Sequence, residues 1–371
     1  MITVLYTVAT GSMGGTQRFL DGVLSSHSRR FRPVLLAFER GAWLDEVRDR
    51  GITAYCLEGL RWRYPARCFH EVAKILRTEN VAIVHSADAW CHALVAPAAM
   101  RFRCKRVWFN HGPIDAKAWQ GPMPLVPAHL LLTNSQFMRD RLANTWHGAR
   151  KIGVVPLGID LERWRPDPAR RVQFRQSHGI DSATLAIGIA GFIDVWKGQD
   201  VLLRAVKLAR PRLLRLRVLI IGGPRDGLVA PRCIEFEREL RAYCAQNSLD
   251  DLVTFTGHLD LREGALDALD VLVHASTEPE PFGMVLLEGM AKGKAIIASA
   301  EGGPREILTD QHDGLLVQPR SEAKLAAALE AIALDPLRRE RLGEAALKTV
   351  NARFSTHVVT IDLERWYDAI L

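Results

Sequence analysis

The sequence lacks several motifs by which large classes of protein are identified. It contains no GxxxxGK[ST] loop, no G-x-S-x-G turn and no G-x-G-x-x-G fingerprint. These absences argue against a P-loop nucleotidase, a serine hydrolase and a nicotinamide-dependent enzyme. No apolar run approaches about 18 residues, so we expect no membrane span. No basic segment precedes the first apolar run, so we expect no signal peptide and a cytoplasmic location.

Cysteine is sparse and shows no pattern. The six cysteines form no C-x-x-C pair, and no group of His and Cys has the spacing of a metal site. We therefore expect reduced, mostly structural thiols and no bound metal ion.

The length and the charge distribution indicate two domains of different character. A chain of 371 residues is too long for one ordinary core. Residues 1–165 carry 23 Lys and Arg against 13 Asp and Glu, whereas the remainder carries 26 against 29. A basic first half suggests an anionic partner, although a merely solvated surface would have the same composition.

Short apolar runs alternate with helical patterns along the first half. Strands are predicted at residues 2–8, 33–38, 52–57, 81–85, 105–110, 129–133 and 151–155. Such alternation predicts a parallel sheet with helices on both faces, whose ligands bind at the carboxyl ends of the strands. After a proline-rich break at residues 165–169 the pattern restarts, with strands expected at 184–190, 216–221, 271–274 and 295–299.

Three loops at the carboxyl ends of first-half strands are candidate ligand contacts. Gly14 and Gly15 follow the first strand, and glycines let a backbone approach a ligand closely, although a plain tight turn would also use them. His111 directly follows a strand, where it is either a site residue or part of a turn. Residues 133–135 are predicted to cap a helix.

The most informative stretch is residues 274–306, HASTEPEPFGMVLLEGMAKGKAIIASAEGGPREI. An apolar strand ends at His274, and an acidic, proline-containing loop carries Glu280. Gly283 then opens a predicted helix in which Glu288 lies roughly 7.5 Å further along the axis. Two carboxylates therefore flank the beginning of one helix.

The amides of Phe282, Gly283 and Met284 lie at the beginning of this helix. The first amides of a helix have no carbonyl partner within the helix and lie at the positive end of its dipole, which is an arrangement that suits a phosphate group. A carboxylate one turn further in, that of Glu288, suits a ribose diol. Glu280 would face whatever the phosphate carries.

This stretch resembles the sugar-nucleotide motif of retaining glycosyltransferases of family 4. The resemblance rests on S-T-x-P-E-P-F-G, E-G-M-A-x-G, I-A-S and G-G-x-x-E in series. It implies the α/β fold called GT-B, with two Rossmann-like domains whose parallel sheets face each other across a cleft. Residues 1–165 would bind the acceptor and residues 166–353 the sugar nucleotide. A helix in residues 354–371 would cross back onto the first domain.

The resemblance also implies roles for individual residues. Lys197, at a predicted strand-to-helix turn, would neutralise the diphosphate together with the amides around Gly283. Glu288 would hold the ribose, and Glu280 would act as a catalytic residue on the donor sugar. The implied reaction moves a hexose from a nucleoside-diphosphate sugar to a hydroxyl acceptor with retained configuration.

In the first domain, the resemblance implies that His111 is a catalytic residue near the donor sugar. It also implies that Gly14 and Gly15 bind the donor, close to its diphosphate and to the acceptor. The D-x-D motif of the other large glycosyltransferase fold is absent, so we expect no metal requirement and no cofactor. One departure is Phe192, where many family members carry an arginine for the diphosphate. Two alternatives remain open, a related sugar-nucleotide epimerase and a non-catalytic sugar-nucleotide-binding subunit.

The acceptor is predicted from the basic first half. Basic and aromatic residues interleave at residues 61–64 and 101–108, and such segments favour an anionic membrane surface. We expect an enzyme of polysaccharide or cell-envelope glycan synthesis, peripheral on the inner face of the cell membrane. Its acceptor would be a glycan or a lipid-linked sugar, and a soluble acceptor is the rival. No nucleic-acid-binding motif accompanies the charge.

Overall fold

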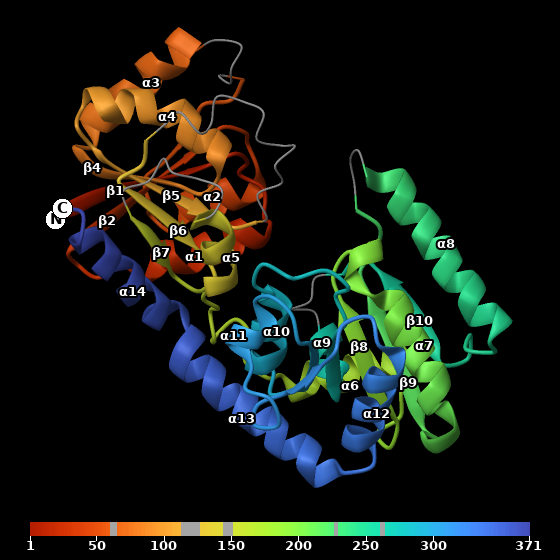
Figure 1. Cartoon of the computed structure of the whole chain (residues 1–371). Coiled ribbons are helices and arrows are strands. Elements are labelled where there is room, and N and C mark those ends of the chain that lie inside the picture. Colours follow the sequence, from red (N-terminus) through yellow and green to blue (C-terminus); the bar gives the residue numbers. More distant parts are fainter. Residues whose placement is uncertain (60–64, 113–126, 144–150, 226–228, 260–263) are drawn as a thin grey trace. The chain divides into compact units, whose positions relative to one another are not determined.

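The computed structural model describes residues 1–59, 65–112, 127–143, 151–225, 229–259 and 264–371 (Figure 1). The chain divides into two compact units. Unit 1 comprises Met1–Ile159 and Phe354–Leu371, and unit 2 comprises Asp160–Arg353. The division thus falls a little before the boundary at residue 165 that the sequence suggested.

Within its described residues, unit 1 contains a seven-stranded parallel sheet of order β3-β2-β1-β4-β5-β6-β7. The strands are β1 (Ile2–Val8), β2 (Phe31–Ala37), β3 (Ala54–Cys56), β4 (Val81–Ser86), β5 (Lys105–Asn110), β6 (Leu130–Thr133) and β7 (Ile152–Val154). The order reverses at β1, which pairs with β2 on one side and with β4 on the other. The strands are almost continuously apolar, as expected where helices cover both faces.

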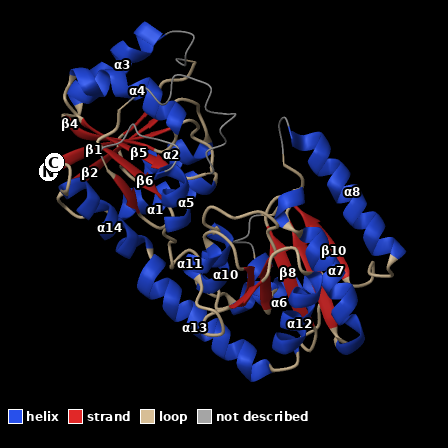
Figure 2. Ribbon diagram, viewed as in Figure 1, coloured by secondary structure: helices blue, strands red, loops and turns tan. Residues whose placement is uncertain are grey.

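Helices cover both faces of this sheet (Figure 2). They are α1 (Gly15–Ser26), α2 (Ala42–Asp49), α3 (Pro65–Thr78), α4 (Ala89–Arg101), α5 (Gln136–Ala143) and α14 (Thr356–Asp368). Leu5 of β1 belongs to the core formed with α3 and α4. Because successive strand residues point to opposite faces, Tyr6 points to the face that α1 and α14 cover.

Within unit 1, the C-terminal helix α14 is attached to the sheet and to α1 by buried polar contacts as well as by packing. The Tyr367 hydroxyl lies 2.9 Å from the Tyr6 hydroxyl and 2.6 Å from His85 Nδ1. Burial raises the pKa of both tyrosines and lowers the pKa of His85, so all three are neutral. Gly22 of α1 permits the close approach, because a Cβ there would lie 2.5 Å from Thr356 Cγ2.

The described part of unit 2 contains a six-stranded parallel sheet of order β10-β9-β8-β11-β12-β13. The strands are β8 (Leu185–Ala190), β9 (Leu216–Ile221), β10 (Val253–Gly257), β11 (Val271–His274), β12 (Ala295–Ser299) and β13 (Leu315–Val317). This sheet reverses at β8, which pairs with β9 and with β11. Both units therefore have Rossmann-like topology.

Helices cover the two faces of this sheet also. They are α6 (Pro168–Ser177), α7 (Gln199–Ala209), α8 (Ala230–Gln246), α9 (Ala265–Ala268), α10 (Met284–Ala291), α11 (Pro304–Ile307), α12 (Glu322–Ala333) and α13 (Pro336–Phe354). Helices α7 and α12 pack side by side over Ile187. On the opposite face, a Cβ at Gly289 of α10 would lie 2.4 Å from Leu272 Cδ2, so α10 sits directly on β11.

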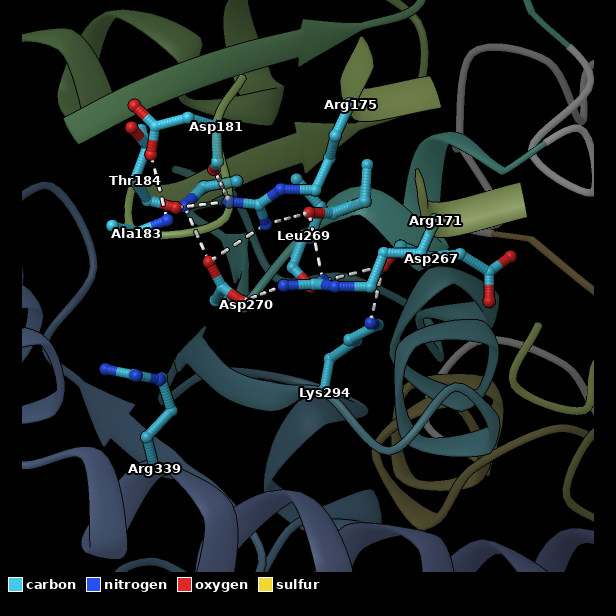
Figure 3. Close-up of polar contacts among 12 residues, drawn as sticks. Arg171, Arg175, Asp181, Ala183, Thr184, Asp267, Leu269, Asp270, Lys294 and Arg339 are labelled. Carbon is cyan, nitrogen blue, oxygen red and sulfur yellow. Dashed lines mark hydrogen bonds and ion pairs between the residues drawn. The ribbon is translucent and has the colours of Figure 1, made fainter. Parts of the chain in front are cut away.

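Two arginines of α6 fasten it to the amino ends of β8 and β11 (Figure 3). Arg171 Nη2 donates to Asp270 Oδ1 at 2.6 Å, and Arg175 Nη1 lies 3.4 Å from Asp270 Oδ2. Asp270 also accepts the Ala186 amide at 2.8 Å. Burial raises the pKa of Asp270, but this amide and the two guanidinium groups outweigh burial and lower the pKa below its usual value. The carboxylate is thus ionised and fixed.

Candidate functional site

The carboxyl edge of the unit 2 sheet contains a polar site. Strand β8 is followed in sequence by β9 on one side, while β11 lies on its other side. Ligands of such sheets bind beyond the carboxyl ends of the strands where the order reverses. The loops after β8 and β11 carry Lys197 and Glu280 to this point.

Lys197 ends a short 3-10 turn, Val195–Lys197, that is held against the end of β11. Gly198 has φ of 75°, and a Cβ there would lie 2.0 Å from the carbonyl oxygen of Ala275, so only glycine fits. The Thr277 amide donates to the Trp196 carbonyl at 2.7 Å. The two loops therefore form one rigid edge.

On this edge, Lys197 Nζ lies 2.8 Å from Glu280 Oε2 and 3.8 Å from the centroid of the Trp196 ring. The lysine side chain is 22% exposed and the glutamate side chain 13%. The ammonium is thus held by a carboxylate and an aromatic face, while part of it stays open to solvent.

Glu280 is held by two further side chains. His274 Nε2 lies 3.3 Å and Ser276 Oγ 3.4 Å from the same oxygen, Oε2. Burial raises the pKa of Glu280, but the hydrogen bond from His274 and the charge of Lys197 outweigh burial and lower the pKa to about 2. No hydrogen-bond donor from the described residues reaches Oε1. Glu280 is therefore an ionised carboxylate with one oxygen engaged by the protein.

The backbone of Glu280 is fixed as well. Its carbonyl accepts the Gly303 amide at 2.8 Å. Gly302 has φ of 70°, and a Cβ there would lie 2.3 Å from the same carbonyl oxygen. The G-G-x-x-E segment after β12 thus closes against the acidic loop after β11.

Helix α10 begins beside this carboxylate. Its N-cap is Gly283 in the left-handed region, with φ of 106°, and Met284 is the first helical residue. Phe282 is 3% exposed, and Glu288, one turn inside the helix, is 2% exposed. The structure thus places Lys197 against Glu280 and puts Glu288 on the helix that Glu280 precedes.

In unit 1, the imidazole of His111 is enclosed by aromatic rings. Its ring centroid lies 4.3 Å from that of Phe109 and 5.6 Å from that of Phe19 on α1. Neither ring nitrogen has a hydrogen-bond partner among the described residues. Burial lowers the pKa of His111 to about 3, so the ring is neutral at physiological pH.

Gly14 and Gly15 open the helix that carries Phe19. Gly14 is the N-cap of α1, and nothing lies within 4 Å of a Cβ built at Gly15. The predicted cap at residues 133–135 is confirmed, because Ser135 Oγ accepts the Met138 amide at 3.2 Å.

The basic and aromatic segments have different outcomes. Residues 61–64 lie outside the described part of the chain. In residues 101–108, Trp108 is 1% exposed because it points into the core from β5, so the expectation that it faces a membrane was wrong.

No helix among the described residues is both long and apolar enough to cross a bilayer. Nor do those residues contain a group of His, Cys, Asp and Glu arranged to hold a metal ion.

Sequence reasoning did not find His274 and Ser276 as partners of Glu280. The sequence feature that could have identified them is a histidine at the end of an otherwise apolar strand, followed two residues later by a serine. Nothing along the chain indicated that both side chains would turn toward Glu280.

Comparison with known proteins decides the family. The model "Glycosyl transferases group 1" matches residues 171–349, and "Glycosyltransferase Family 4" matches residues 13–163. The chain belongs to glycosyltransferase family 4. The resemblance to family 4 is thereby confirmed, and so is the GT-B fold in the sense of two Rossmann-like domains with parallel sheets.

Curated relatives of this family 4 chain match over part of their length. A D-inositol 3-phosphate glycosyltransferase of Stackebrandtia nassauensis is 35% identical over 251 residues, 65% of this chain and 54% of that protein. A GDP-mannose-dependent alpha-(1-6)-phosphatidylinositol monomannoside mannosyltransferase of Mycobacterium tuberculosis is 31% identical over 228 residues, 59% and 56% respectively. The chain thus spans little more than half the length of these two relatives.

Among solved structures, HepE of Anabaena in complex with UDP has a TM-score of 0.84 and 20% identity, covering 100% of both chains. A glycosyltransferase of Rickettsia africae has a TM-score of 0.82 and 22% identity. At this level of identity the two structures support the fold of the family 4 chain.

Proposed function

We propose that this chain transfers a hexose from a nucleoside-diphosphate sugar to a hydroxyl acceptor, with retained configuration and without a metal ion or cofactor. The observation that carries the proposal is the contact between Lys197 and Glu280 at the carboxyl edge of β8 and β11, beside the beginning of α10. The names of the relatives support it, since one is GDP-mannose-dependent and HepE was solved with UDP and with UDP-glucose.

The reaction must stabilise a departing diphosphate and a developing positive charge on the sugar. An ammonium has three donors, so Lys197 can keep its contact with Glu280 while it donates to a phosphate oxygen. The first amides of α10, at Gly283 and Met284, add preorganised donors for the leaving group. Glu288, on the same helix, would accept hydrogen bonds from the ribose.

Glu280 is suited to the sugar rather than to the phosphate. Its pKa of about 2 keeps it ionised at any physiological pH, so it is a poor general acid. Because its contacts with the described residues fall on Oε2, the Oε1 oxygen can accept a hydrogen bond from a sugar hydroxyl. A fixed negative charge beside the sugar would also favour the oxocarbenium-like transition state.

We propose that in unit 1 His111 is a catalytic residue for the donor sugar, and that Gly14 and Gly15 bind the donor close to its diphosphate. A neutral imidazole with unpartnered nitrogens among the described residues can donate one hydrogen bond and accept another. That chemistry suits a hydroxyl group on either substrate.

We further propose an anionic acceptor, lipid-linked or part of a cell-envelope glycan, met at the cytoplasmic membrane surface. The basic first half supports this, as do the inositol phosphate and phosphatidylinositol groups in the names of the relatives. Co-sedimentation with phosphatidylglycerol vesicles at low and high salt tests it. Failure to bind at low salt, together with efficient use of a soluble sugar acceptor, would contradict the membrane proposal.

The activity itself is tested by a panel of UDP and GDP sugars, first for binding by thermal shift and then for turnover. Transfer with retention requires the same anomeric configuration in donor and product by NMR. Epimerisation of the sugar when no acceptor is present would indicate an epimerase. Binding without turnover over a broad acceptor panel would indicate a binding subunit.

A further inference from the structure

A second cation stands on the carboxyl edge of unit 2, in the loop after β9. Arg225 follows the Gly222-Gly223-Pro224 turn, and its guanidinium carbon lies 5.7 Å from the centroid of the Phe192 ring. The loop is fixed to the loop after β8, because the Ile193 amide donates to the Gly223 carbonyl at 2.8 Å. Arg225 therefore rests over the residue that takes the place of the arginine expected after β8.

Arg225 is connected to the Lys197 site through shared neighbours. Its Nη1 lies 3.5 Å from Asp194 Oδ2, which also accepts the Trp196 indole N–H at 3.1 Å. The ring of the same Trp196 lies 3.8 Å from Lys197 Nζ, so Trp196 contacts both Asp194 and Lys197. The two cations thus lie on either side of Asp194 and Trp196, within one continuous series of contacts.

The charge of the edge explains why a second cation matters. Lys197 is paired with an ionised Glu280, so these two side chains together carry no net charge. A nucleoside diphosphate carries at least two negative charges at neutral pH. An ammonium that is already paired with a carboxylate is a weak counterion for such a group. A guanidinium, by contrast, can bind two phosphate oxygens at once.

The contacts of Arg225 leave it ready to bind a ligand. Its side chain is 47% exposed, and its 3.5 Å contact with Asp194 is longer than a strong charge-assisted hydrogen bond. Phe192 is 49% exposed and offers an aromatic face that supports the guanidinium without taking up its N–H groups.

We propose that Arg225 is a second phosphate-binding residue of the nucleotide site, supported by the ring of Phe192 and drawn from Asp194 to the diphosphate. This inference rests on the proposed function. Arg225, in the loop after β9, would replace the arginine that many family members carry at the position of Phe192. The role is binding, because the guanidinium would contact the leaving diphosphate throughout the reaction.

The first experiment is calorimetric titration of the full chain with UDP, GDP and inorganic pyrophosphate. Arg225→Gln should weaken binding of whichever of the two nucleotides the wild type prefers by roughly 10- to 100-fold, and should weaken pyrophosphate binding as well. The corresponding nucleoside, uridine or guanosine, should be unaffected. Arg238→Gln is the matched control, since Arg238 is also exposed and paired with a carboxylate, that of Glu235.

The second experiment is a rescue. In the Arg225→Gln background, Phe192→Arg moves the guanidinium to the loop after β8 and should restore most of the lost nucleotide affinity. If the wild type binds a nucleotide and Arg225→Gln binds it equally tightly, the inference is wrong and the proposed function stands. If the wild type binds neither nucleotide nor pyrophosphate, the proposed function fails and the inference falls with it.

Discussion

Glu280→Gln is the substitution whose effect can be worked out most fully from the structure. The pKa of Glu280 is about 2 in the folded chain against an ordinary 4.5, which corresponds to about 3 kcal/mol of stability. Because the folded-state pKa is the lower one, this contribution is fully present above pH 4.5 and is lost as the pH falls toward 2. Glutamine keeps the shape but has no charge to offer Lys197 and His274.

The assay is urea denaturation of wild type and Glu280→Gln at pH 7, 5 and 3. The unfolding free energy of the variant should be lower by about 3 kcal/mol at pH 7 and 5, and this gap should shrink by about 2 kcal/mol at pH 3. Glu235→Gln, at a side chain that is 61% exposed, is the control and should change little. A gap that is absent at pH 7, or as large at pH 3 as at pH 7, would refute the reasoning.

Three further substitutions separate the proposed roles. Glu288→Ala should weaken binding of the preferred nucleoside diphosphate by about 1.5–3 kcal/mol in calorimetry, and unchanged affinity in a folded variant would remove its ribose role. His111→Ala should lower kcat with little change in nucleotide affinity. In the wild type, protonation of His111, whose pKa is about 3, should cause no fall in kcat as the pH is lowered to 5. Tyr367→Phe should cost about 1–3 kcal/mol of stability in urea, because it removes the hydroxyl shared by Tyr6 and His85, and an unchanged midpoint would contradict that contact.

The sequence predicted most of the strands because buried parallel strands are continuous apolar runs. The predicted ranges 2–8, 105–110, 216–221, 271–274 and 295–299 coincide with β1, β5, β9, β11 and β12. Strand β13, Leu315–Val317, was missed because three residues show no periodicity. The last helix was expected from residue 354, but α13 continues through Phe354, and Ser355 Oγ caps α14 by accepting the Val358 amide at 3.3 Å.

The sequence predicted which residues form the candidate site better than it predicted which of them are in contact. Lys197 and Glu280 each follow a strand end, which the sequence shows. Their pairing depends on β8 lying beside β11 and not only beside β9, and the two residues are 83 positions apart. The same holds for Arg225 and Phe192, which meet only because the loops after β8 and β9 are joined at Ile193. Strand order sets these contacts, and no local pattern encodes it.

The most direct test of the central claim, that the carboxyl edge of unit 2 binds a nucleoside-diphosphate sugar through Lys197, is calorimetric titration with UDP and GDP. Lys197→Ala should weaken binding of the preferred nucleotide at least tenfold, since a charge-assisted hydrogen bond to the diphosphate is lost. Lys207→Ala, at an exposed position of the following helix α7, should bind as the wild type does. Equal affinity of the wild type and Lys197→Ala, or no binding of either nucleotide by the wild type, would contradict the account.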